Sequence, residues 1–526
     1  MLRTILTFSA SIIFSQSIEN ISYDFIKHQG HILNKGSLVW NEDWHSNGLF
    51  FDGTFANYPS TYGPVIEKRI LKSIEDITGL DSSKILSYFD YVQGDYYLDN
   101  LDLGIKYANP GRVINLHAFK RRYAGAYNHY NYGFGTISPI HYTFLGDYNF
   151  KRNNENFFIS LGNFNSDYGL LDSSNTSFLD SKITSSSLKY ENQYDSLIFK
   201  LDYNIFFQRL NGLHSSSIFE SVIYLTRTKI NGSIMMLSSD KYNYGLSYNL
   251  NKRSLDHDAV KNFIWNRFDF FIQNKKSKYS IGLNTSKDDY DLIFSGRSNF
   301  QLGLIRSKIN YERSYKPYHI AYADSLTFEK NDCIWIENRL QMKRLQTGFD
   351  FAFQNLEREI DNMGLPTKGN NLWISFYLSY VFQNDLEFSI RYNKSISNKY
   401  INDGIGDRMK IQLGNNFNLF SNAMTLKYHV SVDGYLNRKN EYALTPIERY
   451  PVHQSEQAPL ENLWVPSFTV TCFVKNVEIS YAMNHLTNII DDYLNRNYDS
   501  NQIVFNKYYP SVTRLASLAI KWNFYN

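Results

Sequence analysis

Cysteine is almost absent from this chain of 526 residues, which contains only Cys333 and Cys472. Two cysteines exclude a disulfide framework, and whether these two form a single bridge stays open. Neither lies in a Cys-X-X-Cys pair or beside histidines, so a structural zinc site has no ligands at a suitable spacing. His28 and His31 are close in a polar segment, where histidines are more typical of a surface than of a metal site. We predict no metal and no cofactor.

Long apolar runs and a strong charge of one sign are missing as well. No stretch reaches the roughly 20 apolar residues of a membrane-spanning helix. The 54 Lys and Arg residues nearly balance 51 Asp and Glu residues, giving a net charge of +3, and no basic block stands out. Nucleic acid is therefore not a predicted partner. The common hydrolase, metalloprotease, P-loop and dinucleotide motifs are absent, so we predict no catalytic residues and no enzyme activity.

Aromatic residues are abundant, with 42 Tyr and 38 Phe against only 11 Pro. This composition excludes a disordered or collagen-like chain, because so much aromatic surface must be buried in protein or lipid. The mean hydropathy of −0.41 is typical of a soluble protein. Membrane barrels reach similar values, however, because their strands alternate apolar and polar residues.

The N-terminus has the pattern of an export signal. Arg3 is followed by a short apolar run from Thr4 to Phe14 and by the small residues Ser15 and Ser17. This pattern predicts a signal peptide over residues 1–17, with a buried N-terminal strand as the alternative. We therefore expect the mature protein to leave the cytoplasm.

Residues 18–109 have a mixed pattern and are predicted to form a periplasmic or lumen-side segment. Within it, residues 64–78 are predicted to form one amphipathic helix, with Pro64 in the first turn and Gly79 at the C-terminal cap. The apolar face of this helix comprises Ile66, Ile70, Leu71, Ile74 and Ile77.

From residue 110 to 526 the pattern changes to strict alternation. In the stretch 196–208, apolar residues such as Phe199 and Tyr203 alternate with polar ones, and the stretch 372–382 alternates over eleven residues. Strands in soluble domains average about 5–6 residues, whereas a tilted strand that crosses a bilayer needs about 9–11. We therefore predict an all-β fold: an antiparallel, up-and-down transmembrane β-barrel. At about 23–26 residues per strand and connection, it would have about 16–18 strands.

Aromatic residues near predicted strand ends suit the girdles at the two lipid–water interfaces. They are Trp335, Trp373, Tyr392, Trp464 and Trp522.

The polar parity of the strands gives candidate pore-lining residues. They are Lys120, Arg122, Lys200, Asp202, Asn204, Glu387, Arg391, Lys427, His429 and Asp433. Their mixed signs argue against strong charge selectivity. The cluster Lys120-Arg121-Arg122 has an alternative location, at a rim that faces lipid head groups or bulk water. A one-residue bulge would reverse any such assignment.

The C-terminus ends in an amphipathic strand whose apolar residues run from Leu518 to Phe524 and alternate with Ala519, Lys521 and Asn523. This strand resembles the C-terminal insertion signal of bacterial outer-membrane barrels, although Tyr525 and Asn526 follow the last alternating aromatic. The resemblance implies recognition by the barrel-assembly machinery.

A wider stretch resembles the porins and TonB-dependent-receptor barrels of diderm bacteria. It comprises residues 476–488 with the segment Asn484-His-Leu-Thr-Asn488, then Tyr508-Tyr-Pro510, Arg514 and the final strand. Residues 18–109 are too short for the full plug of a TonB-dependent receptor, so the resemblance favours porin-like members without one.

These observations predict an exported protein of the outer membrane of a diderm bacterium, in contact with outer-membrane lipid. It would act as a porin-like channel for passive diffusion of small solutes, and a homotrimer is possible. The alternatives are a TonB-dependent-type nutrient uptake barrel that needs an energising partner, an outer-membrane barrel enzyme, and a secreted β-rich binding protein.

Overall fold

A computed structural model describes residues 20–24, 29–34, 37–38, 84–122, 140–169, 178–213, 222–238, 242–256, 260–286, 290–317, 328–358, 368–398, 407–439, 442–444, 451–453, 459–484, 486–487, 490 and 514–525. In these ranges no helix is both long and apolar enough to cross a bilayer. The predicted signal peptide and the predicted helix over residues 64–78 lie outside the described residues.

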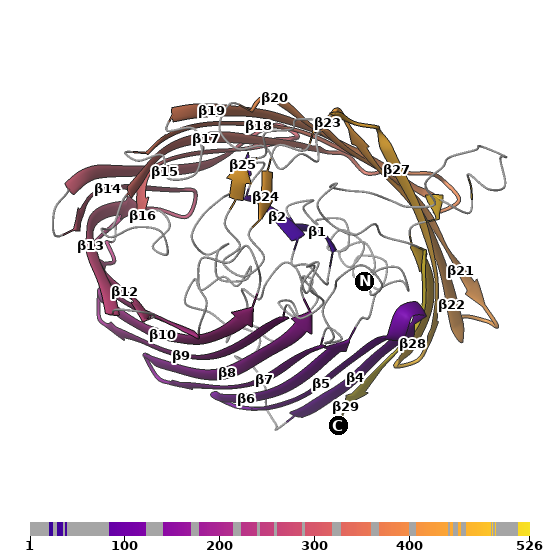
Figure 1. The fold of residues 1–526 in the computed structure, drawn as a ribbon, viewed down its shortest axis with the longest axis horizontal. Coiled ribbons are helices and arrows are strands. Elements are labelled where there is room, and N and C mark those ends of the chain that lie inside the picture. The colour runs from indigo at the N-terminus through magenta and orange to yellow at the C-terminus, as the bar shows by residue number, and fades with distance from the viewer. Residues whose placement is uncertain are drawn as a thin grey trace.

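A closed antiparallel barrel of 22 strands makes up nearly all of the described structure. Each strand pairs with its neighbours in chain order, and the last strand, β29 (Leu515–Tyr525), pairs with the first barrel strand, β4 (Lys84–Gly94). Figure 1 shows this closure as a ring in which yellow β29 lies beside indigo β4. The predicted fold class is therefore confirmed.

The first half of the barrel continues with β5 (Leu98–Asn109), β6 (Arg112–Arg122), β7 (Ile140–Arg152), β8 (Glu155–Gly169), β9 (Phe178–Tyr194), β10 (Leu197–Leu213), β11 (Ile223–Met236), β12 (Asn243–Asp256), β13 (Val260–Gln273) and β14 (Ser277–Ser286). The second half comprises β15 (Tyr290–Leu302), β16 (Ile305–Pro317), β17 (Phe328–Gln341), β18 (Leu345–Arg358), β19 (Lys368–Val381), β20 (Glu387–Asn398), β21 (Asp407–Leu419), β22 (Met424–Leu436), β27 (Leu463–Val474) and β28 (Val477–Asn484).

Short elements accompany the barrel. A 3₁₀ turn, η3 (Asp95–Tyr97), joins β4 to β5. Three small sheets pair β1 (Asn20–Asp24), β2 (Gln29–Asn34) and β3 (Ser37–Leu38); β23 (Arg438–Lys439) and β26 (Pro459–Leu460); and β24 (Tyr442–Leu444) and β25 (Pro451–His453). In Figure 1 the strands β1, β2, β24 and β25 project inside the ring.

The two rims of the barrel differ in the length of their connections. At one rim the connections are tight, for example residues 110–111, 153–154 and 475–476, and this short-turn rim also holds the start of β4 and the end of β29. At the other rim the connections reach the lengths of residues 437–462 and 485–514. In outer-membrane barrels the short turns lie on the periplasmic side and the long loops outside, and the two rims of this barrel have the same asymmetry.

Two predicted boundaries differ from the structure. The barrel has 22 strands rather than 16–18, and it begins at Lys84 rather than at residue 110, so that β4 and β5 occupy the end of the segment assigned to residues 18–109. The strand number was underestimated because two-residue connections shorten the repeat. In addition, Asn231-Gly232, which has a turn-like sequence, lies inside β11 without interrupting it.

Several strands are longer than a bilayer requires. Strands β9 and β10 have 17 residues each, against about 11 for a tilted spanning strand. Near the long-loop rim they carry an ion-pair cluster in which Asp180 Oδ2 lies 2.9 Å from Arg209 Nη1 and 3.5 Å from Lys182 Nζ. The outward side chains of these strands change from apolar to charged near the long-loop rim. This change indicates where the apolar band of the outward face ends on that side.

Candidate functional site: the inward face of the barrel

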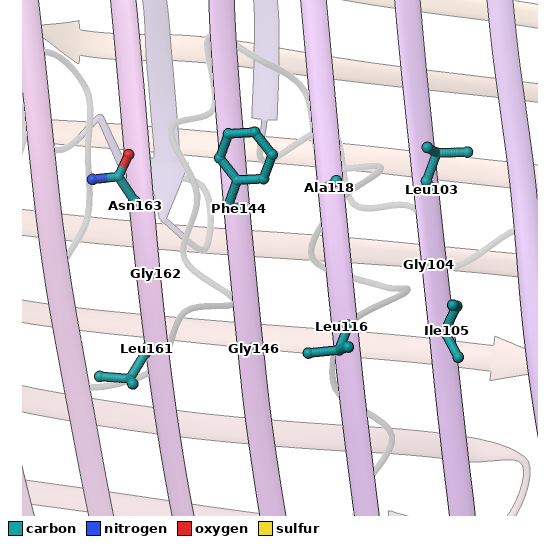
Figure 2. Close-up of a pocket in the computed structure, with 10 residues that line it drawn as sticks. All are labelled: Leu103, Gly104, Ile105, Leu116, Ala118, Phe144, Gly146, Leu161, Gly162 and Asn163. Carbon is teal, nitrogen blue, oxygen red and sulfur yellow. The ribbon is translucent and has the colours of Figure 1, made fainter.

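The outward face of the wall is identified by an apolar groove on β5 to β8. Leu116, Phe144 and Leu161 line it and are 56%, 58% and 58% exposed. Figure 2 shows the side chains of this groove in front of the near wall, with the strands of the opposite wall crossing behind them. These side chains therefore project away from the barrel interior.

The strand register carries this assignment around the barrel. Directly paired residues share a face, and successive residues alternate. Following the pairs from Ile105↔Leu116 on β5 and β6 through all 22 strands returns the same assignment at Leu518↔Gln93 and Phe89↔Leu103. One register shift, between Leu372 and Trp373, interrupts the described barrel pairing, and it falls near the end of the β19–β20 pair.

Eight of the ten candidate pore-lining residues occupy inward positions by this register. They are Lys200, Asp202, Asn204, Glu387, Arg391, Lys427, His429 and Asp433. They come from β10, β20 and β22, where strict alternation of apolar and polar residues defines the faces. Whether they line a permeation path stays a prediction.

Lys120 and Arg122 are placed differently from the prediction. On β6 they share the parity of Leu116 and Ala118, so they lie on the outward face near the long-loop rim. Three consecutive basic residues show no alternation between polar and apolar side chains, so they do not indicate which face each residue occupies. The alternative location at a rim is the one that fits the register.

The aromatic candidates divide in the same way. Tyr392, Trp464 and Trp522 occupy outward positions, whereas the register places Trp335 and Trp373 at inward positions, contrary to the prediction. At the short-turn rim, outward Trp522 and Phe524 stack with ring centroids 4.6 Å apart. Amphipathic or stacked aromatic rings at this height are typical of the membrane interface.

Ion pairs across neighbouring strands cover much of the inward face. Lys200 Nζ lies 2.8 Å from Glu191 Oε2, Lys308 Nζ lies 3.0 Å from Glu337 Oε1, and Lys521 Nζ lies 3.2 Å from Glu478 Oε2. The Arg339 guanidinium also holds Asp350 in a two-pronged pair. The three lysine–glutamate pairs join directly opposed positions, whereas Arg339 and Asp350 are diagonal neighbours; both arrangements stabilise the strand register while leaving the wall hydrophilic.

Part of the inward wall is deeply buried. Ser160 and Ser187 are Cα partners on β8 and β9, and each is only 1% exposed. Beside them, Asp147 of β7 is also buried and accepts a 2.6 Å hydrogen bond from Asn115 Nδ2. Polar side chains this well covered do not face open solvent, although the lumen of a barrel of this size is wide.

A second part of the inward wall is strongly basic. On β11, β12 and β13 the inward positions carry one acidic residue, Asp269, and five basic residues, namely Arg227, Lys229, Arg253, Lys261 and Arg267. Arg227 and Arg253 are direct Cα partners. Arg267 Nε lies 2.7 Å from Asp269 Oδ2. We call these five basic residues the basic wall.

The comparisons with known proteins concern the fold. No protein-family model matches the sequence, and no curated protein matches it. The FrpB iron transporter from Neisseria meningitidis superposes with a TM-score of 0.64 at 8% identity, covering 86% of this chain and 83% of FrpB. The siderophore receptor PirA from Acinetobacter baumannii gives 0.63 at 9% identity, covering 85% and 81%. The ferric enterobactin receptor PfeA of Pseudomonas aeruginosa gives 0.62 at 8% identity, covering 84% and 81%.

These neighbours are TonB-dependent outer-membrane receptors. The chain has their fold. Identities this low show the barrel architecture alone, which separates the chain from β-sandwich folds.

Sequence reasoning missed the basic wall and the buried Ser160–Ser187 region. Alternation in β12 was recognised, with Tyr244, Leu246 and Tyr248 outward, but its continuation to Arg253 was not followed. Continuing the same parity from each recognised strand into its neighbours would have found Arg227, Arg253 and Arg267. The covering of Ser160 has no local signal, because its Cα partners Asp147 and Ser187 lie on other strands.

Proposed function

We propose that this protein is a nutrient uptake barrel of the TonB-dependent type, with a lumen closed by the N-terminal part of its own chain. Strand number carries the proposal. Barrels of 16–18 strands leave an aqueous channel, whereas outer-membrane transporters of 22 strands hold a plug. The structural neighbours support it, since their names are those of an iron transporter and siderophore receptors.

Three observations support closure of the lumen. The chain before Lys84 meets the barrel at the short-turn rim, from which it can enter the lumen. Strand β3 lies next to β18, and β1 and β2 project within the ring in Figure 1. The third observation is the burial of Ser160 and Ser187 on the inward wall. We therefore assign the plug role to the chain before Lys84, although its length had favoured a barrel without a plug.

The basic wall favours a particular ligand charge. Lys229, Arg267 and their neighbours stand in the middle and upper parts of β11 to β13, where a solute entering from the long-loop rim would meet them. Clustered basic groups in a cleft attract anions and raise their local concentration. We propose a small anionic metal chelate, such as a ferric chelate, as the substrate class.

The test is ion conductance of the full chain in a planar lipid bilayer, together with binding of ferric chelates of different net charge. We expect no persistent current steps from the full chain and large steps from a variant that lacks residues 18–83. We also expect anionic chelates to bind more tightly than neutral ones, with the difference reduced in Arg267→Gln.

Discrete, persistent steps from the full chain would contradict the closed lumen and return the porin as the better interpretation. A silent full chain that binds no chelate of either charge would retain the closed barrel and reject the substrate class.

A further inference from the structure

The groove on the outward face is lined mainly by apolar residues. It spans β5 to β8 and encloses about 520 Å³. Small residues form its floor, with Ala118 and Gly146 on adjacent strands, and Leu103, Phe144 and Leu161 rise around them (Figure 2). A groove lined in this way presents an apolar surface to a hydrocarbon chain.

Polar groups limit the groove on the side of the long-loop rim. Asn163 lines its upper end, and Lys120 is the next outward residue of β6 after Ala118, about 7 Å further along the strand. Arg122 follows about 7 Å beyond Lys120 and is exposed. The groove therefore lies where the apolar band of the wall meets its external polar edge.

Two basic residues of β6 lie at this edge, with Asp99 of β5 and Asp167 of β8 on the same outward face. Lys120 Nζ is 2.6 Å from Asp99 Oδ2, so one basic group is neutralised. The Arg122 guanidinium lies 5.9 Å from the centre of the Tyr97 ring, an arrangement that keeps its charge available on the surface. A ligand in the groove would therefore have the Arg122 guanidinium next to it on the side of the long-loop rim.

We propose that this groove is a binding site for one lipid of the external leaflet, with an acyl chain between Phe144 and Leu116 and an anionic phosphate head group at Arg122. Inside a membrane the groove gains no hydrophobic energy by exchanging one lipid tail for another, because both are equally apolar. Retention instead comes from close packing over Ala118 and Gly146 and from charge attraction at the edge. The site is independent of what the barrel transports.

The experiment is native mass spectrometry of the full chain in detergent, titrated with phosphatidylglycerol or with phosphatidylcholine as probes. Gly146→Val adds side-chain volume to the floor of the groove, where the nearest atom to an added Cβ is Leu116 Cδ2 at 3.4 Å. Its matched control is Gly232→Val, at an outward glycine of β11 with nothing within 4 Å of an added Cβ. Arg122→Gln removes the cation, and Arg112→Gln is its control at the opposite end of the same strand face.

We expect one tightly held phosphatidylglycerol on the wild-type chain and weaker binding of phosphatidylcholine. Gly146→Val should weaken binding of both lipids at least fivefold. Arg122→Gln should weaken only phosphatidylglycerol, by about fivefold, as expected for one basic group beside an anionic lipid. Both controls should match the wild type, and unchanged mobility shifts on boiling would show that every variant is folded.

Equal lipid binding in Gly146→Val and Gly232→Val would overturn the site. Equal affinity for the two lipids in the wild type would also overturn it. A lipid-free dimer that Gly146→Val converts to monomer would assign the groove to a second copy of the chain instead.

Discussion

The assignment of inward and outward faces can be tested by one charged residue placed on either face of β12. Leu246 is outward and 63% exposed, and its cross-strand partners are Ile234 and Phe270, so an arginine there would meet only apolar groups and lipid. It lies near the centre of the outward apolar stretch from Tyr244 to Leu250. Asn249 lies three residues further on the inward face, beside Asn231 and Arg267.

The expected cost of Leu246→Arg follows from this location. An arginine on the lipid face near the bilayer midplane costs about 2–4 kcal/mol, which lowers the folding equilibrium constant by a factor of about 30 to 700. Asn249→Arg should cost less than about 1 kcal/mol, because its side chain stays in the hydrophilic interior and only adds to the positive charge nearby. Equilibrium unfolding in urea, with the protein folded into liposomes, measures both free energies of unfolding.

The difference between the free energies of unfolding of Leu246→Arg and Asn249→Arg tests the assignment of the two faces. Equal losses of stability would mean that the wall is not amphipathic at this height. A larger loss for Asn249→Arg than for Leu246→Arg would show that the faces are reversed, and with them the inward positions of Lys200, Lys427 and Asp433.

Two further predictions follow from local packing. Gly104 lies on the inward face under the ring of Tyr88, so Gly104→Val should lower the free energy of unfolding by about 1–3 kcal/mol. As a control, Gly232→Val should change it by less than about 0.5 kcal/mol. Urea unfolding measures both free energies, and equal effects would contradict the placement of Tyr88. Cys333 is buried on the inward face, Cys472 is half-buried on the outward face, and neither forms a disulfide in the structure. Reduction should therefore not change gel mobility, and Cys472 should react in liposomes with a lipid-soluble maleimide but not with a charged one. Preferential labelling of Cys472 by the charged reagent would refute its outward position.

Alternation over more than nine residues was sufficient to predict the barrel and the faces of its clearest strands. In β10 and β22 every outward residue of the recognised stretch is apolar, so the parity of Lys200, Asp202 and His429 could be taken from the sequence. The C-terminal strand from Leu518 to Phe524 was likewise found, starting three residues after and ending one residue before the bounds of β29. These features are local, and a strand pattern describes them completely.

The rest depended on non-local information. The strand number requires the position of every turn, and two-residue turns such as residues 153–154 contain no Gly or Pro to mark them. Lys120 lies on the outward face because it has the same parity as Ile114 and Leu116 on β6. The prediction considered the basic cluster by itself and did not use these two apolar residues. The covering of Ser160 and the grouping of Arg227 with Arg253 depend on which strands are neighbours, a property of the closed sheet rather than of any one segment.

The pairing of the first and last strands also sets the order of assembly. The amide of Ala516 donates a 2.9 Å hydrogen bond to Asp95 Oδ2, across 421 residues of chain. Until β29 has been synthesised and exported, β4 presents an unpaired edge, which is a template for aggregation. The pairing of β4 with β29 therefore joins residues that are very far apart in the sequence, and such pairing is slow to form. A chain that lacks β29 cannot form it. A premature stop that removes only the last eleven residues would leave an open sheet with two exposed edges. Changes at the C-terminus should therefore affect the yield of closed barrel more than the stability of any single strand.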